Sequence, residues 1–536
     1  MVENIRRPPS ALAFARNAVL LLCLIAPSAW MIATIPPLWR DVDAYIQLTQ
    51  DPRVTIFWGH APAYGYLAKV PLFLGEQWER WRGIAVAHAE TGLSTLTDTG
   101  VWLLIIAQHL ALAGAAFYFI VAISRSFWVR FALSLVWASC ALFYTFAHCV
   151  GSESLSIILM TLVSAKGLRL VSPATETRGK DWCSFAVALS LCLLSRKVNV
   201  LLIFLLPTAF LLSWILTTFS IRFAAIEQWP RLRALRMSAL RHAITALAVG
   251  ISCLLVANSL PHLLARKTRL HPHSRMGYTF LFRLQFLKDL PPATRLALLN
   301  KIATRTQSTE ARRLVTLLGQ MHEETASVTA ESFTHRAIPV LFPDDASIPW
   351  EKLDVALNQM ALPFLLPPTP ELWHAARNDF SSALKTPVPA IVDNLFETTV
   401  YFFEHRSDMS GCAGLITFRN SSAEAIARIP LEHPYFYLWR GVTANRGLIL
   451  SLIALALLVA IAQRRKENFV TIPLFAISLT ALGLLISATN CLLTEFLPRF
   501  VAPLWLLLLL SLLILAGRAA DLFWGKSAGQ HCRPEP

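Results

Sequence analysis

Apolar residues along this chain fall into long runs that are separated by shorter polar stretches. A run of about 20 apolar residues is long enough to cross the hydrocarbon core of a bilayer as a helix. Ten runs approach this length, at residues 17–36, 99–123, 131–149, 153–170, 182–195, 198–219, 242–261, 446–463, 469–488 and 499–518. The pattern therefore predicts an all-α polytopic membrane protein with about ten transmembrane helices.

Two long polar segments, 37–98 and 262–445, divide these spans. The first is a loop within the N-terminal transmembrane module, residues 1–261. Residues 262–445, between the seventh and eighth spans, are long enough to form a domain of their own. The C-terminal helices and a short tail occupy residues 446–536.

The segment 262–445 has the spacing of amphipathic helices. In "TPELWHAARNDFSSALKT", Thr369 is suited to the N-cap and Pro370 to the first helical position. Apolar residues then recur at helical spacing, so we expect this domain to be mostly helical. In the first loop, "PLFLGEQWERWRG" with Trp78 and Trp81 suits a helix that lies in the membrane interface.

Composition and charge agree with a membrane protein. The chain is 55% hydrophobic and only 15% charged, with a mean hydropathy of +0.52 and a net charge of +15. The basic clusters alternate along the chain, which is the positive-inside pattern and places both termini in the cytoplasm. The net positive charge is therefore explained by the membrane topology, and we expect no nucleic-acid partner. The preference for Arg over Lys favours a bacterial inner membrane, and the nine cysteines show no metal-binding or disulfide pattern.

Charged residues also occur at the outward ends of the spans, where they are costly unless they are used. They are Asp41, Asp43, Glu153, Arg196, Lys197, Glu495 and Arg499, with His148 beside Glu153. Each has a structural explanation when taken alone, such as a solvated loop acid, a helix-dipole carboxylate or a snorkelling arginine. Because they share one side and alternate in sign, together they favour a shared polar cavity.

These residues resemble the motifs of the GT-C superfamily of membrane glycosyltransferases. An acidic motif, "WRDVDAY", follows the first span and is itself followed by "WGHAPAYGYL". Later come "GSESLSIILM" at the start of a span, "LLSRKVNVLLIFLLP" between two spans and "PRFVAPLWLLLLL" near the end. The order is most similar to protein O-mannosyltransferases and to the aminoarabinose transferase of lipid A, but the large outward domain lies between spans seven and eight.

The resemblance implies transfer of a sugar from a polyprenyl-phosphate-linked donor to an extracytoplasmic acceptor, which is an envelope glycan, a lipid or a protein. It implies that Asp43 is the general base, and that Asp41 orients the acceptor or binds Mg²⁺ or Mn²⁺ together with Asp43. Cations suited to hold the donor phosphate are Arg196, Lys197 and Arg499. Residues expected to bind the acceptor or support the site are His60, Tyr64, Glu153 and Glu495.

Three alternatives remain open at this point. A transporter or flippase for a lipid-linked glycan also needs a polar cavity, although it is expected to show repeated halves or discontinuous helices. An O-antigen ligase or polymerase-like enzyme also works outside the cytoplasm with loop arginines. The third alternative is a non-enzymatic subunit of an envelope assembly machine.

The topology is tested by reporter fusions. A reporter inserted within 262–445 should be active outside the cytoplasm, and one fused after Arg222 should be active inside it. A cytoplasmic reporter within 262–445 would contradict the side assigned to the candidate residues.

Overall fold

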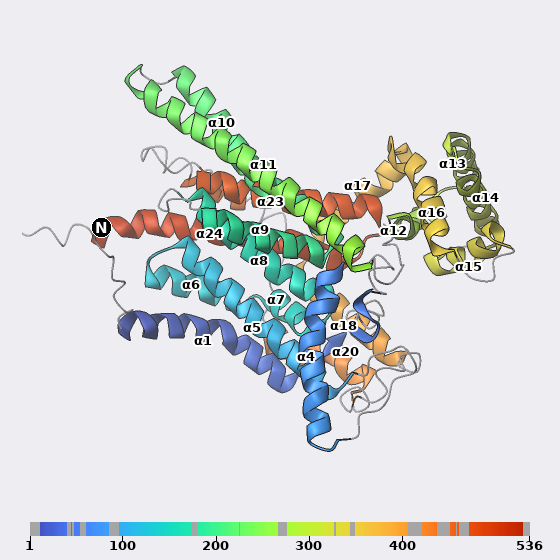
Figure 1. The fold of residues 1–536 in the computed structure, drawn as a ribbon, viewed down its shortest axis with the longest axis horizontal. Helices are drawn as coiled ribbons and strands as arrows, with labels where there is room; N and C mark the ends of the chain where they lie inside the picture. Colours follow the sequence, from blue (N-terminus) through green and yellow to red (C-terminus); the bar gives the residue numbers. More distant parts are fainter. Residues whose placement is uncertain are drawn as a thin grey trace, which may run out of the picture.

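The described part of the chain is almost entirely helical (Figure 1). It also contains two strands of two residues each. The computed structural model describes residues 11–39, 44, 48–53, 61–84, 96–172, 179–223, 226–265, 276–325, 328–343, 349–405, 415, 421–436, 451–456, 458–459 and 471–528.

The first half of the chain forms most of a helical bundle. Its elements are α1 (Ala11–Thr34), β1 (Leu38–Trp39), α4 (Pro62–Trp81), α5 (Asp98–Ile123), α6 (Phe127–Ala138), α7 (Ala141–Ala147), β2 (Cys149–Val150), α8 (Ser152–Val171), α9 (Gly179–Ser195), the 3₁₀ helix η1 (Lys197–Phe204), α10 (Leu205–Phe223), η2 (Ile226–Gln228) and α11 (Trp229–Ala265). α10 and α11 form a hairpin that leaves the bundle at an angle and extends past it on the side of the N-terminus (Figure 1).

The second half adds outer helices and completes the bundle. Its elements are α12 (Met276–Arg283), η4 (Leu284–Asp289), α13 (Pro292–Arg305), α14 (Thr309–Glu324), α15 (Ala330–Leu341), α16 (Trp350–Leu365), α17 (Pro370–Lys385), α18 (Val388–Glu404), α20 (Ala423–Glu432), α23 (Thr471–Leu493), η7 (Pro498–Val501) and α24 (Ala502–Ala528). The N-cap predicted at Thr369 is confirmed, because its hydroxyl accepts from the N–H of Leu372.

The prediction of an all-α multi-pass membrane protein is confirmed at this level. Among the described residues, seven helices are long and apolar enough to cross a membrane, or eight if the bent pair α6–α7 is one span. α9 also coincides with an expected span but has only 17 residues. The expected span 446–463 is described only at 451–456 and 458–459, so the count of ten remains a prediction.

The third expected span, 131–149, is not one continuous helix. α6 and α7 meet at an angle of 65°. At the bend, the N–H of Cys140 bonds to the carbonyl of Trp137, three residues back, and the Ser139 hydroxyl bonds to Val136. The bend turns α7 into the bundle, where all seven of its residues are buried. The apolar pattern did not predict this break because the run is apolar on both sides of it.

One end of the bundle gathers the basic residues. The Arg16 guanidinium lies over the Phe127 ring at 5.5 Å, which joins the start of α1 to the start of α6. The Ser124 hydroxyl donates to Asp521 at 2.6 Å, and the Arg130 side chain donates to the Ser124 carbonyl at 2.6 Å. We call this the basic end. It brings together the ends of helices that the positive-inside pattern places on one side.

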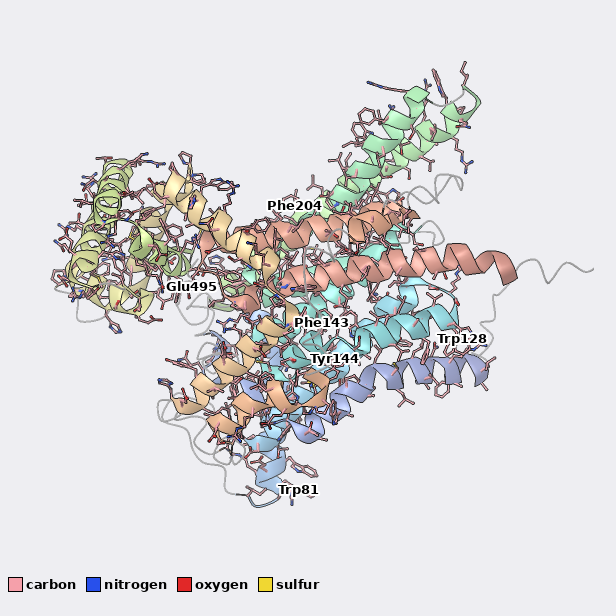
Figure 2. All side chains as sticks on the ribbon, turned by 180° about the vertical axis from the view of Figure 1, so that it is seen from behind. Trp81, Trp128, Phe143, Tyr144, Phe204 and Glu495 are labelled. Carbon is pink, nitrogen blue, oxygen red and sulfur yellow. The ribbon has the colours of Figure 1, made fainter. Side chains whose placement is uncertain are left out.

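The opposite end, which we call the far end, carries the outer helices. Trp128 and Glu495 mark the basic end and the far end in Figure 2. Beyond the far end, α12 to α16 surround a hydrophobic core of their own. α18 and α20, in contrast, contribute to the core of the bundle. The described helices of the segment 262–445 therefore form one helical unit with its own core, α12 to α16, and a second group, α18 and α20, that packs on the bundle.

α4 lies across the far ends of the spans rather than along them (Figure 1). It crosses α5 where glycines face each other. A Cβ added to Gly75 would lie 2.2 Å from both the Cα and the N of Gly100. Only glycine permits this approach of two helix backbones.

Gly75→Ala should therefore destabilise the protein. The added methyl group has to push α4 away from α5, and overpacking of this kind costs about 1–3 kcal/mol. Gly114→Ala is the matched control, because a Cβ there meets nothing within 4 Å. Thermal unfolding of the purified protein in detergent measures both. Equal or higher stability of Gly75→Ala than of Gly114→Ala would contradict the close crossing.

Candidate functional site

The chain between α7 and α8 forms a turn that is recessed below the far end of the bundle. Its strand β2 pairs with β1 in parallel, with Leu38 opposite Cys149 and Trp39 opposite Val150. The turn lies against Gln108, which is ten residues beyond the start of α5 at Asp98. Ten helical residues span about 15 Å. We call residues 147–151 the recessed turn.

Polar side chains supply the hydrogen bonds that the recessed turn needs. The Gln108 amide donates to the carbonyls of Ala147 at 2.9 Å and Cys149 at 3.2 Å. The Tyr64 hydroxyl accepts from the N–H of Gly151 at 2.9 Å. Non-helical backbone at membrane depth is stable only where protein groups satisfy it. Tyr64, which was predicted to support the site, therefore holds α4 against the start of α8.

Two buried histidines continue this network toward α1. His148 Nε2 lies 2.9 Å from the carbonyl of Ile35, which can only accept, so this nitrogen donates. His148 Nδ1 then accepts from His109 Nε2 at 3.1 Å. His109 Nδ1 is left to accept from the Ser28 hydroxyl at 3.0 Å. With both rings neutral, one proton arrangement satisfies all three contacts, and the chain of bonds fixes Ile35 before β1.

α18 fixes β1 from the other side. The Thr399 hydroxyl accepts from the N–H of Trp39 at 3.0 Å. It also lies 3.0 Å from the Trp39 carbonyl. The Trp39 ring stacks on Phe402, with centroids 4.8 Å apart and planes within 4° of parallel. The start of the first loop is thus held by a helix more than 350 residues away in the sequence.

Glu153 and Arg196 form an ion pair next to the recessed turn. Glu153 lies in the first turn of α8 and is 4% exposed. An oxygen of its carboxylate is 3.5 Å from the Arg196 guanidinium, which is 19% exposed. Arg196 is the residue between α9 and η1, and Lys197 begins η1. The structure therefore brings together a carboxylate and a guanidinium that are 43 positions apart.

Asn199 holds this connection in place. Its side-chain amide donates to the carbonyl of Cys192 at 2.9 Å and lies 3.1 Å from the Ser195 hydroxyl. It also lies 2.9 Å from the Ser156 hydroxyl on α8. Asn199 is fully buried. These contacts tie η1 to both neighbouring helices, so the position of Arg196 is set by a buried polar network.

Glu495 and Arg499 lie in the connection between α23 and α24. Burial raises the pKa of the Glu495 carboxyl, while the charges of Lys288 and Arg499 oppose this shift. Lys288 belongs to η4, so this carboxyl faces the outer helices. η7, which contains Arg499, contacts α18. η7 thus lies against the same helix that holds Trp39, and Glu495 lies toward the outer helices.

The remaining predicted site residues are Asp41, Asp43 and His60, and all three lie outside the described residues. The structure describes the chain up to Trp39, then Ala44 and residues 48–53, and again from Ala61, so Asp41 and Asp43 of the acidic motif are not described. Within the described part of the chain, no group of three or more His, Cys, Asp or Glu side chains is placed to hold a metal ion. The expectation of Mg²⁺ or Mn²⁺ at Asp41 and Asp43 stays a prediction.

Several residues of the network were not predicted from the sequence. Gln108 and His109 interrupt the apolar run "VWLLIIAQHLALAG", and Asn199 interrupts "VNVLLIF". Polar residues inside a span are rare and usually face the bundle interior, so these interruptions carry a signal. Charged residues at span ends do not point to Gln108, His109 or Asn199, because these three lie inside apolar runs. Thr399 gives no such signal, because it does not interrupt the apolar run of a predicted span.

No protein-family model and no curated protein matches this chain. The class of the protein therefore follows from the fold and the site. It is an all-α multi-pass membrane protein with a recessed, hydrogen-bonded candidate site at the far end, opposite the basic end. The site pairs an anion with a guanidinium in a largely dry setting, where charges interact strongly.

The Glu153–Arg196 pair can be tested by a double-mutant cycle. Arg196→Gln or Glu153→Gln removes one charge from a buried pair, and such a loss costs up to about 3–5 kcal/mol. The double variant should be more stable than the sum of the two losses predicts, because neither charge is left behind. Thermal unfolding in detergent measures all three variants.

Arg80→Gln is the control for this cycle. Arg80 pairs with Glu76 on the surface of α4, where its side chain is 52% exposed, and such pairs contribute at most about 1 kcal/mol. Additive losses in the Glu153 and Arg196 variants, no larger than that of Arg80→Gln, would show that the two side chains do not interact.

Proposed function

We propose that the protein is a GT-C-type glycosyltransferase that moves a sugar from a polyprenyl-phosphate-linked donor to an extracytoplasmic acceptor. The observation that supports this most is the buried Glu153–Arg196 pair beside the strand that leads into Asp41 and Asp43. A guanidinium at the membrane face suits a lipid-linked phosphate, and a nearby loop carboxylate suits a general base.

The anchoring of β1 supports the role of the acidic motif. Trp39 is held by Val150 on one side and Thr399 on the other. Asp41 and Asp43 follow Trp39 by two and four positions, and successive Cα atoms are about 3.8 Å apart. The covalent chain alone therefore limits their distance from the start of α8, where Glu153 lies.

The basic end supports the proposed orientation. If it faces the cytoplasm, as the positive-inside rule predicts, the recessed turn faces the opposite side of the membrane. We therefore propose a plasma membrane location, in a bacterial inner membrane, with both termini in the cytoplasm. A lipid-linked donor in the outer leaflet would then meet a water-borne or membrane-bound acceptor at the far end.

In the proposed reaction, the bond between the anomeric carbon and the phosphate oxygen breaks, and the acceptor oxygen bonds to that carbon. Asp43 takes the proton of the acceptor hydroxyl, and Asp41 orients the acceptor. Arg196, Lys197 and Arg499 stabilise the charge that develops on the leaving phosphate. Glu153 holds Arg196 in place at 3.5 Å. His60, Tyr64 and Glu495 support the acceptor side.

The base is tested by Asp43→Asn, which keeps the shape of the side chain and removes the proton acceptor. Transfer from a labelled polyprenyl-phosphate sugar should fall by about 10²–10⁴, because positioned general bases contribute that much. Binding of the donor should be retained. Asp51→Asn is the matched control in the same loop, since Asp51 is 40% exposed and pairs with Arg53 at 2.6 Å.

The two outcomes that contradict the proposal are distinct. Full transfer by Asp43→Asn would remove Asp43 as the base and leave the proposed reaction in place. Movement of the lipid across the membrane without any transfer to an acceptor would instead support the flippase alternative and overturn the proposed function.

A further inference from the structure

α4 has three distinct faces. Its buried face rests on the bundle and consists of Tyr64, Gly65, Ala68, Leu72, Gly75 and Glu79. With about 3.6 residues per turn, most side chains away from this face are apolar and exposed, with Gln77 as an exposed polar residue among them. The apolar side chains are Leu67 (49%), Val70 (59%), Phe73 (58%), Leu74 (55%), Trp78 (50%) and Trp81 (78%). Charged residues, Lys69, Glu76 and Arg80, occupy the one edge between these two faces.

The buried face is firmly attached, so the apolar face cannot turn inward. Gly75 meets the backbone of Gly100 on α5. The Glu79 carboxylate accepts from the N–H of Thr99 at 2.8 Å. At the other end of α4, the Tyr64 hydroxyl accepts from the N–H of Gly151 at 2.9 Å. Both ends of the helix are therefore fixed to the bundle.

The polar edge is attached as well. The Lys69 ammonium donates to the carbonyl of Leu48 at 2.5 Å, and burial lowers the pKa of this lysine to about 8. Glu76 and Arg80 form an ion pair at 2.6 Å further along the same edge. The edge thus carries the polar contacts of α4 and separates its buried face from its apolar face.

The depth of α4 relative to the membrane indicates that lipid covers its apolar face. α4 crosses α5 at Gly100, the third residue of a 26-residue membrane-spanning helix. This is the depth at which a span enters the headgroup region. α4 also packs against α9, whose Val187 is 61% exposed on the outside of the bundle. α4 therefore packs against α5, which is long and apolar enough to span the membrane, and against α9, an expected span.

The positions of Trp78 and Trp81 agree with a depth at the membrane interface. Their rings contact each other with centroids 5.2 Å apart near the end of α4, and Trp81 marks the tip of the helix in Figure 2. Tryptophan is enriched at the membrane interface, where its ring meets the acyl chains and its N–H meets water. An amphipathic helix with aromatic residues on its apolar face lies in the plane of the interface.

We propose that the apolar face of α4, defined by the six residues above, docks onto the lipids of the leaflet at the far end. Through Tyr64 and Gly75, α4 then holds the recessed turn at a fixed depth relative to the membrane surface. This surface role is independent of the reaction that takes place at the site.

Tryptophan quenching in nanodiscs tests the proposal with the full-length protein. The chain has 16 tryptophans, so the signal of α4 is the difference between the native protein and the variant Trp78→Phe/Trp81→Phe. Phosphatidylcholine brominated near the carboxyl end of its acyl chains should quench most of this difference signal. Acrylamide, which quenches from the water phase, should reduce it much less than the brominated lipid does.

Trp373→Phe is the matched control, because Trp373 is 60% exposed on α17 among the outer helices. Its difference signal should be quenched by acrylamide and hardly by the brominated lipid. If the α4 signal behaved like that of Trp373, the apolar face would lie in water and the proposal would be overturned. Protection from both quenchers would also overturn it, because protein would then cover the face.

Discussion

The structure depends on the need to satisfy backbone hydrogen bonds at membrane depth. The chain leaves helical geometry at the recessed turn, about 15 Å along α5 from the start of that helix. Unsatisfied N–H and C=O groups at this depth would each cost several kcal/mol. Gln108 and Tyr64 supply hydrogen bonds to the turn itself. His148 satisfies the carbonyl of Ile35 just before the paired strand β1.

The contacts that satisfy this backbone also bring the residues of the candidate site together. Once β1 is paired with β2 and held by Thr399, the first loop has to begin beside the start of α8. Glu153 is then buried at the start of that helix and requires a cation, which Arg196 provides. Groups that satisfy the backbone and groups that offer chemistry are therefore neighbours in one network. A substitution in either set should therefore alter the positions of side chains in the other.

The sequence predicted the membrane-spanning class because long apolar runs have few alternatives to transmembrane helices. Local signals also sufficed for the N-cap at Thr369. The bend at Ser139 and Cys140 could not be predicted, because both sides of it are equally apolar. Contacts between distant segments, such as Trp39 with Thr399, depend on the packing of whole helices rather than on local pattern. For the site, the sequence identified charged span ends but not the partner of each charge.

The central claim is that the far end binds a lipid-linked phosphate next to Arg196. It is tested most directly by a cryo-EM structure of the protein in nanodiscs with a polyprenyl phosphonate, a stable analogue of the donor. The account predicts density for the phosphonate within about 3 Å of the Arg196 guanidinium. It also predicts that the prenyl chain enters the leaflet at the far end, beside the recessed turn. A phosphonate bound at the basic end, or between helices at the middle of the bilayer, would contradict it.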